Sequence, residues 1–494
     1  MPERGSDVMK KLGFGVIGVF ALFVAIIVVR TLMLSGSSVA AAVENPPAYD
    51  GNAIAGRLSE AIRIQTISWS TQRPPDAEAF ADFSAFLERA YPAAHGAMTR
   101  EIVGGHSLIY KWAGTSAVEK PIALTAHIDV VPVEAGTEDL WTEPAFSGAI
   151  AEGAVWGRGA MDNKGQLIAI MEAVETLAAE GFAPSRDVYL LFGHDEELGG
   201  FAGAGEMAKL LKSRGVHFEW TLDEGSGLVQ GIIPGVASPV ALISTGEKGS
   251  TTLRFTASAP GGHSSAPGKD TAISVAARAV IAVMDNPYPL EIDGNVVSFL
   301  HAIATQMPFF QRMALANLWL TGPIIKKQLA EDPTTAAALH TTTAPTIIEG
   351  GEKTNILPQQ TTVFVNYRIH PRDNVAAVKE RAIRLIDDDR VTVEAVGGRE
   401  PSPAASARSD GYRALETATA TIFGDVPIAP FITLQGTDTR HYIGLADDNY
   451  RFTPFIYRSD DLARIHGNDE RVMIEDLARG AAWYEVLLRE TAGD

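Results

Sequence analysis

Strand-like apolar runs alternate with helical segments over most of this chain, and several of the strands are followed by carboxylate-rich turns. Residues 121–133, 187–197 and 218–227 each contain an apolar run that is followed by carboxylate-bearing residues, while 166–181 and 202–215 have helical spacing. This alternation predicts an α/β fold with a mixed, mostly parallel sheet. Because ligands bind beyond the carboxyl ends of the strands in such sheets, the turns are the places to search for a site.

The pattern changes from about residue 247 and returns near residue 401. Residues 249–259 and 361–371 alternate like half-exposed strands, and 271–286 and 374–389 have helical spacing. We therefore expect a smaller α+β lid domain inserted into the catalytic domain. The expected divisions are a cytoplasmic N-terminus at 1–11, an anchor or signal at 12–34, a linker at 35–52, catalytic parts at 53–246 and 399–494, and a lid/dimerisation domain at 247–398.

The stretch 298–339 inside the lid domain also has a helical appearance, and its role stays open at this point. Three roles are open for this stretch: covering the dimerisation surface of the lid, enlarging the substrate cleft, or touching a membrane.

An uncharged apolar run occupies residues 12–29, close behind Arg4, Lys10 and Lys11. Eighteen helical residues extend roughly 27 Å, close to the thickness of a bilayer core. Basic residues before the run favour a cytoplasmic N-terminus with the rest of the chain outside, in a periplasmic or extracellular location. Small residues at 40–42 offer a cleavage site, which would make the protein secreted. We expect a single-pass membrane anchor, with the cleaved signal as the alternative.

Composition restricts the chemistry. The chain has no cysteine, which excludes a thiolate nucleophile and cysteine-ligated zinc, so any metal site must use His, Asp and Glu. A formal net charge of −19 argues against nucleic acid as a partner, because phosphate binding requires a basic face.

Five turns carry the candidate metal ligands: AHIDVVP, GRGAMDNKG, GHDEELGG, TLDEGSG and RIHGNDER. Each alone has an ordinary explanation as a surface histidine, a solvated loop or a helix cap. Together, at the strand ends of one sheet, they favour a nitrogen and oxygen site for zinc, cobalt or manganese. Two ions about 3.5–4 Å apart, sharing one carboxylate, would need this number of ligands. His127 and Asp129 have the i, i+2 spacing that would let Asp129 accept the second imidazole proton of His127.

The motifs also resemble one known family. AHIDVVPV, WGRGAMDNKG, GHDEELGG, LDEGSG, EKGS, GGHSSAPG, TNILP, YRIHP, GTDTRHY and RIHGNDER occur in its order over about residues 50–490. It is the zinc metallopeptidase family of carboxypeptidase S, glutamate carboxypeptidase, aminoacylase and the acetylornithine deacetylase/succinyl-diaminopimelate desuccinylase enzymes. Within it, the chain is most similar to carboxypeptidase S and the secreted N-fatty-acyl-amino-acid synthase/hydrolase.

The resemblance implies five ligands for two zinc ions. His127 and Asp223 would hold one ion, Glu197 and His466 the other, and Asp162 would bridge them. The neighbouring Glu224 is the alternative to Asp223.

The resemblance also assigns roles to five further residues. Asp129 would orient a ligand, Glu196 would be the general base, and His263 on the lid would stabilise the oxyanion. Asn355 and Arg368 would contact the substrate, with Arg368 at its carboxylate. In some family members the lid dimerises and the partner chain supplies the oxyanion histidine, so a homodimer through the lid is a further expectation.

The expected function is therefore hydrolysis of the amide bond of N-acyl amino acids or short peptides with a free C-terminal carboxylate. Water activated by two zinc ions, or by cobalt or manganese, would attack the carbonyl, with a glutamate as the base. A carboxypeptidase or dipeptidase acting strictly on peptides is the enzymatic alternative. A non-catalytic binding protein of the same fold is the alternative from another class.

Overall fold

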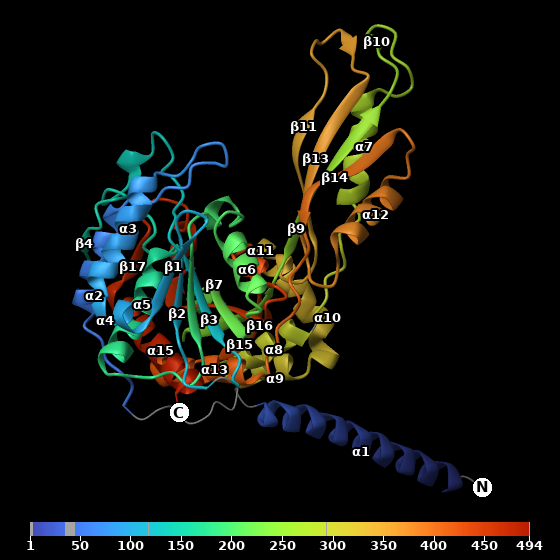
Figure 1. The fold of residues 1–494 in the computed structure, drawn as a ribbon. Coiled ribbons are helices and arrows are strands. Elements are labelled where there is room, and N and C mark those ends of the chain that lie inside the picture. Colours follow the sequence, from blue (N-terminus) through green and yellow to red (C-terminus); the bar gives the residue numbers. More distant parts are fainter. Residues whose placement is uncertain (1–2, 35–44, 117, 293, 494) are drawn as a thin grey trace.

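Four neighbouring parallel strands form the middle of an eight-stranded sheet, which is the core of the large domain (Figure 1). The computed structural model describes residues 3–34, 45–116, 118–292 and 294–493. Part of the predicted linker, with the possible cleavage site at 40–42, lies outside these residues. The strand order is β1 (Thr99–Val103), β2 (Ser107–Trp112), β6 (Val188–Gly193), β3 (Ile122–His127), β7 (Phe218–Gln230), β16 (Ala446–Arg458), β8 (Val240–Glu247) and β15 (Ile428–Thr433).

Helices cover both faces of this sheet. The larger core lies under six of them: α2 (Gly51–Arg63), α3 (Ala77–Ala90), α4 (Pro92–Ala97), α5 (Lys164–Ala179), α13 (Asp410–Phe423) and α15 (Ile474–Ala492). A smaller core on the other face lies under α6 (Ala204–Ser213) and α14 (Thr439–Tyr442). Because both faces are covered, β3 and β6 are buried at every residue, which explains why their sequences are mostly apolar. A small antiparallel sheet of β17 (Arg471–Met473), β5 (Ala154–Trp156) and β4 (Ile150–Ala151) lies beside the domain.

The lid is a separate antiparallel sheet that projects away from the large domain (Figure 1). Its strand order is β11 (Thr342–Glu349), β13 (Gln360–Ile369), β9 (Gly249–Ser258) and β14 (Val391–Arg399). Helices α7 (Ala272–Met284) and α12 (Val375–Ile386) pack on it through one apolar cluster, and β9 and β13 alternate between buried and half-buried residues for that reason. A two-stranded ribbon, β10 (Gly262–His263) with β12 (Ile356–Leu357), lies at its tip.

Four helices, α8 (Gly294–Ala304), α9 (Phe309–Ala316), α10 (Leu318–Leu329) and α11 (Pro333–Ala337), form the insert that the helical pattern of 298–339 predicted. An apolar cluster joins α8 to β15 and β8 of the large domain, so the insert is fixed to the edge of the main sheet. The α/β fold with a mostly parallel sheet is confirmed. We propose the same domain boundaries as above, because the lid strands begin at Gly249 and end at Arg399.

The first helix, α1 (Glu3–Met33), extends away from the body of the protein (Figure 1). Within the described residues, its segment Gly15–Met33 is the one stretch long and apolar enough to cross a membrane. Most of that segment is exposed, unlike the core helix of a soluble protein.

Candidate active site

Two groups of possible metal ligands lie next to each other at the carboxyl end of the central strands. The first contains His127, Asp162 and Glu224. His127 is the last residue of β3, Glu224 lies within β7, and Asp162 lies in the turn just before α5. His127 Nε2 lies 2.9 Å from Asp162 Oδ1 and 3.3 Å from Glu224 Oε1. A histidine nitrogen and two carboxylates therefore point at one position.

The second group contains Asp162, Glu197 and His466. His466 Nε2 lies 3.0 Å from Asp162 Oδ2 and 3.2 Å from Glu197 Oε2. Asp162 therefore directs one carboxylate oxygen at each histidine, which is the geometry of a carboxylate that bridges two ions. Glu197 lies in the short turn that follows β6, and its Oε1 is buried without a hydrogen-bond partner among the described residues.

The structure brings Glu224, rather than Asp223, to the first group. Asp223 Oδ2 accepts hydrogen bonds from the Thr439 backbone N–H at 2.8 Å and from Thr439 Oγ1 at 2.7 Å. Consecutive residues of a strand face opposite sides, so only one of these two carboxylates can face His127. We therefore propose Glu224, the alternative left open by the sequence, in place of Asp223 as the third member of this group.

Asp129 is placed differently from the sequence expectation. Strand β3 ends at His127, so the i, i+2 rule of strands does not extend to Asp129. His127 Nδ1 donates to the Asp129 backbone carbonyl at 2.9 Å, and the Asp129 carboxylate is 3.5 Å away. That donation leaves Nε2 free to act as a ligand.

The Asp129 carboxylate instead fixes the turn that carries the two glutamates. Its oxygens accept from the backbone N–H groups of Glu196 at 3.1 Å and Glu197 at 3.2 Å, and from Ser68 Oγ at 2.7 Å. Asp129 is wholly buried, so these bonds are shielded from water. One residue therefore positions both the histidine of β3 and the turn after β6.

Glu196 belongs to neither ligand group. Its Oε1 lies 3.7 Å from Arg440 Nη2. Burial and the charge of Asp438 raise the pKa of Glu196 well above its ordinary value. A carboxylate beside the ligands but outside both groups is available for proton transfer.

Asp438 was not singled out by sequence reasoning, although it lies in the GTDTRHY motif. Its carboxyl is buried, and burial together with Asp223 raises its pKa well above the ordinary value. The loop that carries it follows β15, and nothing in the local sequence indicates that it returns to Glu196.

A buried ion pair between Arg158 and Glu470 was also missed. Arg158 Nη1 lies 2.7 Å from Glu470 Oε2, and Glu470 Oε1 accepts from three backbone N–H groups, among them that of Asp162 at 3.1 Å. Arg158 also donates to the backbone carbonyl of His466 at 3.2 Å. The pair joins the loop of Asp162 to the loop of His466. Both residues lie in motifs quoted above, and only their separation of 312 positions hides the contact.

The pKa values of both histidines and of Glu197 in the ligand groups are raised, so these groups favour binding a proton where a cation would bind. Hydrogen bonds to Asp162 and Glu197 raise the pKa of His466 to about 10. Burial and the charge of Asp162 raise the pKa of Glu197 to about 7. Burial opposes protonation of His127, yet Glu224 and the hydrogen bonds to Asp129 and Asp162 raise its pKa well above the ordinary value. Carboxylates packed this closely, one of them with an unpartnered buried oxygen, fit a site built for cations.

The three lid residues named from the sequence are not gathered at the ligand groups. His263 and Asn355 are exposed at the lid tip, where the Ser264 backbone N–H donates to the Asn355 carbonyl at 3.1 Å. The tip is the end of the lid farthest from the large domain (Figure 1).

Arg368 lies near the other end of β13, at the base of the lid. It lines a pocket of about 400 Å³ together with Lys248, Ala337, Thr342 and residues 434–436. The loop that begins in this pocket continues to Asp438 and Arg440 beside Glu196. Arg368 is therefore the lid residue that this conformation brings toward the site.

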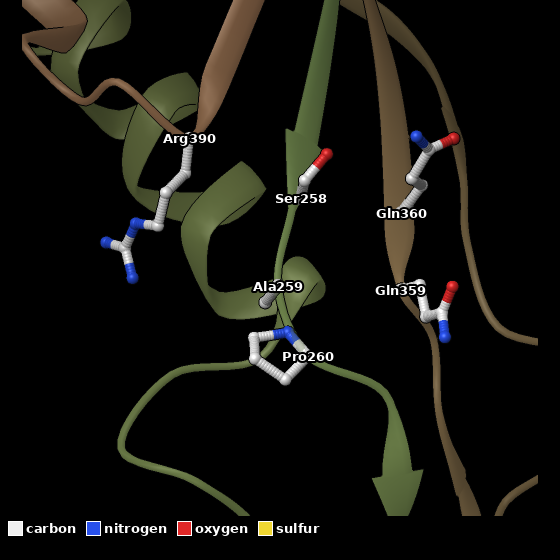
Figure 2. Close-up of a pocket in the computed structure, with 6 residues that line it drawn as sticks. All are labelled: Ser258, Ala259, Pro260, Gln359, Gln360 and Arg390. Atoms are coloured by element: carbon white, nitrogen blue, oxygen red, sulfur yellow. The ribbon is translucent and has the colours of Figure 1, made fainter.

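A second hollow, of about 540 Å³, lies on the lid and is lined by Ser258, Ala259, Pro260, Gln359, Gln360 and Arg390 (Figure 2). The Arg390 guanidinium is already paired with Asp388 and Asp270. The remaining lining residues carry no charge, so this hollow has none of the chemistry of the ligand groups.

Comparison with known proteins identifies the family. Residues 123–490 match the family described as Peptidase family M20/M25/M40. The chain is 37% identical over 446 residues to probable carboxypeptidase S-like 2 of Dictyostelium discoideum, covering 89% of this chain and 85% of that protein. It is 35% identical over 441 residues to the N-fatty-acyl-amino acid synthase/hydrolase PM20D1 of Xenopus tropicalis, covering 88% and 85%. It is 29% identical over 480 residues to carboxypeptidase S of Saccharomyces cerevisiae, covering 86% and 82%.

Solved structures agree on the fold. The M20 family metallo-carboxypeptidase Sso-CP2 of Sulfolobus solfataricus superimposes with a TM-score of 0.63 at 18% identity, covering 89% of this chain and 99% of that one. Human carnosine dipeptidase 1 superimposes with a TM-score of 0.61 at 16% identity, covering 89% of this chain and 96% of that one. The chain belongs to the M20 peptidase family and is a hydrolase, as the sequence motifs predicted.

Proposed function

We propose that this chain hydrolyses the amide bond of N-acyl amino acids, or of short peptides with a free C-terminal carboxylate, at a centre of two zinc ions, with cobalt or manganese as alternatives. The observation that carries the proposal is the pair of ligand groups that share Asp162. The sequence relatives of this chain include proteins named for N-fatty-acyl-amino acid hydrolysis and for carboxypeptidase activity, which supports this substrate class.

In this proposal His127, Asp162 and Glu224 hold one ion, and Asp162, Glu197 and His466 hold the other. Bound ions would supply a water of lowered pKa and polarise the substrate carbonyl. Glu196, outside both groups, takes a proton from the attacking water and delivers it to the leaving nitrogen. Asp129 keeps the turn of Glu196 in place through its backbone hydrogen bonds.

The proposed carboxylate site is the pocket that contains Arg368. This guanidinium is exposed, and no carboxylate of the described residues pairs with it. The nearby Lys248 ammonium is committed to the carbonyls of Ala337 and His340, at 2.9 Å each. Arg368 is thus the group available for bidentate bonds to a substrate carboxylate.

His263 and Asn355 would complete the site from a lid that closes, or from the lid of a second copy of the chain. The edge strand β11 supports a lid-mediated homodimer, because it is unpaired on one side and exposes Ile347 and Ile348. Mixing the inactive variants His263→Ala and Glu196→Gln tests the second arrangement. Recovered activity would support it, and an inactive mixture of proven mixed dimers would contradict it.

We also propose that α1 spans a membrane and holds the catalytic domain outside the cytoplasm, with secretion after cleavage as the alternative. The support is the apolar length of Gly15–Met33 and its exposure. A tag placed after Asp494 should be reachable only from outside the cell, and a cytoplasmic tag would contradict this orientation.

Hydrolysis of a mixed substrate panel tests the proposed activity. The panel contains N-acyl amino acids of varied chain length and dipeptides, assayed with the metal-depleted protein, the zinc-reloaded protein and Glu196→Gln. We expect zinc-dependent hydrolysis of N-acyl amino acids that the variant loses. Cleavage of dipeptides alone would favour a strict peptidase, and the absence of turnover with zinc bound would favour the non-catalytic alternative.

A further inference from the structure

The turn between α9 and α10 exposes a group of large apolar side chains. We call residues 309–325, from the start of α9 into α10, the elbow. Phe309, Phe310, Trp319, Leu320 and Ile324 are 45%, 76%, 53%, 47% and 63% exposed, and no residue of α10 is buried. Five large apolar side chains exposed on one short segment are costly in water and indicate a contact with a membrane or another apolar partner.

The elbow packs along the second half of α1. The Asn317 side-chain amide lies 3.3 Å from the Ile27 carbonyl and 3.3 Å from Thr31 Oγ1. Trp319 makes an edge-to-face contact with Phe23, with ring centroids 5.7 Å apart. Phe23, Ile27 and Thr31 are four residues apart and form one stripe on the helix. The elbow therefore follows α1 over about 12 Å of its length.

This contact fixes the depth of the elbow if α1 spans a bilayer. Phe23 lies near the middle of the apolar segment Gly15–Met33. Half of a hydrocarbon core is about 15 Å thick, so a group beside Phe23 lies among the acyl chains. An elbow in contact with both Phe23 and Thr31 cannot remain in water while α1 crosses the membrane.

Three polar side chains of the elbow, those of Asn317, Trp319 and Thr321, are hydrogen-bonded inside the protein, as a lipid environment requires. Asn317 is 1% exposed, and besides α1 its amide donates to the Met313 carbonyl at 2.9 Å. Trp319 Nε1 donates to Asn317 Oδ1 at 3.2 Å, and the Thr321 hydroxyl donates to the Ala314 carbonyl at 2.5 Å.

The charges of this region favour a membrane surface. Residues 294–330 contain no Asp or Glu in a chain whose formal net charge is −19. Arg312 lies within the elbow, and Lys326 and Lys327 directly follow it. Arg312 donates to the carbonyl of Leu34, just beyond the end of α1, which is the level expected of lipid headgroups.

We propose that the elbow inserts beside α1 into the leaflet that faces the catalytic domain, and that its partner is the acyl-chain region of the bilayer. The proposal rests on the membrane-spanning role of α1 proposed above. It selects membrane contact among the three roles left open for this stretch. The chain continues from α10 to Ala337, which lines the pocket of Arg368, so the lipid-facing surface and the proposed carboxylate site belong to one continuous segment. The substrates that suit this arrangement are N-acyl amino acids whose acyl chains reside in the bilayer.

Single-cysteine labelling of the full-length chain in lipid vesicles tests the location, because the chain has no cysteine of its own. Nitroxide labels are placed at Phe310→Cys and Ile324→Cys in the elbow, at Phe20→Cys in α1, and at the exposed Leu140→Cys and Phe201→Cys on the catalytic domain. We expect the elbow and α1 labels to be relaxed by oxygen and protected from a water-soluble nickel complex. The catalytic-domain labels should show the reverse.

The label positions distinguish insertion of the elbow from insertion of α1. A lipid-exposed label in α1 with water-exposed labels in the elbow would overturn the inference and leave the anchor intact. Water-exposed labels at both places would overturn the anchor and, with it, the inference.

A kinetic comparison of two substrates tests whether the elbow helps to collect substrate from the bilayer. Phe310→Ser/Ile324→Ser should lower kcat/KM for a long-chain N-acyl amino acid in vesicles about tenfold, because insertion is weakened. Hydrolysis of a water-soluble N-acetyl amino acid should stay unchanged, which also shows that the variant is folded. Leu140→Ser, similarly exposed but on the catalytic domain, is the matched control. Equal losses on both substrates, or no loss on either, would contradict a role in collecting substrate from the bilayer.

Discussion

Asp223 and Glu224 are consecutive residues of one strand, and their carboxylates face opposite sides of the sheet: Glu224 Oε1 lies 3.3 Å from His127 Nε2, whereas Asp223 accepts both its hydrogen bonds from Thr439. The strand pleat thus assigns one acidic residue to the ligand group and the other to the loop of Asp438.

Replacing each of the two residues by its amide should have different effects on metal content and activity. Glu224→Gln should reduce the metal content by one ion per chain and abolish most of the activity, because the His127 group loses an anionic ligand. Asp223→Asn keeps an acceptor for Thr439 and should retain both ions. Elemental analysis of the purified variants measures this. Loss of an ion from Asp223→Asn, with Glu224→Gln fully loaded, would reverse the assignment.

Glu470 should support both stability and metal retention, because it joins the loop of Asp162 to the loop of His466. Glu470→Ala leaves Arg158 buried without its partner and should lower the free energy of unfolding by about 3–5 kcal/mol. It should also weaken metal retention, because three backbone donors of the Asp162 loop lose their acceptor.

Denaturant unfolding with a metal-binding titration measures both effects. Glu101→Ala, which breaks the exposed ion pair with Arg214, is the control and should cost at most about 1 kcal/mol. An equal, small effect of both variants would argue against a positioning role for Glu470.

Zinc should stabilise the protein more as the pH rises. In the metal-free protein the pKa of His466 is raised from 6.5 to about 10, so the stability from its protonated ring is complete below 6.5 and is lost as the pH rises through about 10. The pKa of Glu197 is raised from 4.5 to about 7, so its contribution is complete below 4.5 and is lost as the pH rises through about 7. A bound cation takes the place of these protons.

The measurement is the gain in unfolding temperature on adding zinc to the metal-depleted protein, from about pH 6 to about pH 9. We expect the gain to increase over this range. A gain that stays constant or shrinks would mean that these two groups do not release protons to the metal.

Arg368 should matter for substrates with a free carboxylate. Arg368→Ala should lower kcat/KM for an N-acyl amino acid about 10- to 100-fold, since a hydrogen bond to a charged group contributes about 1.5–3 kcal/mol. The same variant should have little effect on the corresponding N-acyl amino acid amide. Arg254→Ala, on β9 of the same lid sheet and paired with Glu394, is the control. Equal losses on acid and amide would place Arg368 outside the carboxylate site.

The sequence predicted the fold well because its signals are local. The mostly apolar strands β3 and β6 and the apolar helices α5 and α13 follow from burial on both faces of one sheet. The helical character of 298–339 was also readable from spacing alone.

Contacts between distant segments could not be predicted in the same way. The choice between Asp223 and Glu224 depends on which face of the strand each residue occupies, and the role of Asp129 depends on β3 ending at His127. Glu470 and Asp438 reach the site from loops far along the chain, and the packing of the elbow on α1 joins segments separated by 290 positions. None of these leaves a pattern in neighbouring residues.

Titration of zinc into the metal-depleted, full-length chain, with N-acyl amino acid hydrolysis followed at each step, tests the proposed two-ion centre most directly. We expect activity to reach its maximum only when two ions are bound per chain, and Glu196→Gln to bind two ions without activity. Full activity at one ion per chain, undiminished activity after complete removal of metal, or an active Glu196→Gln variant would contradict it.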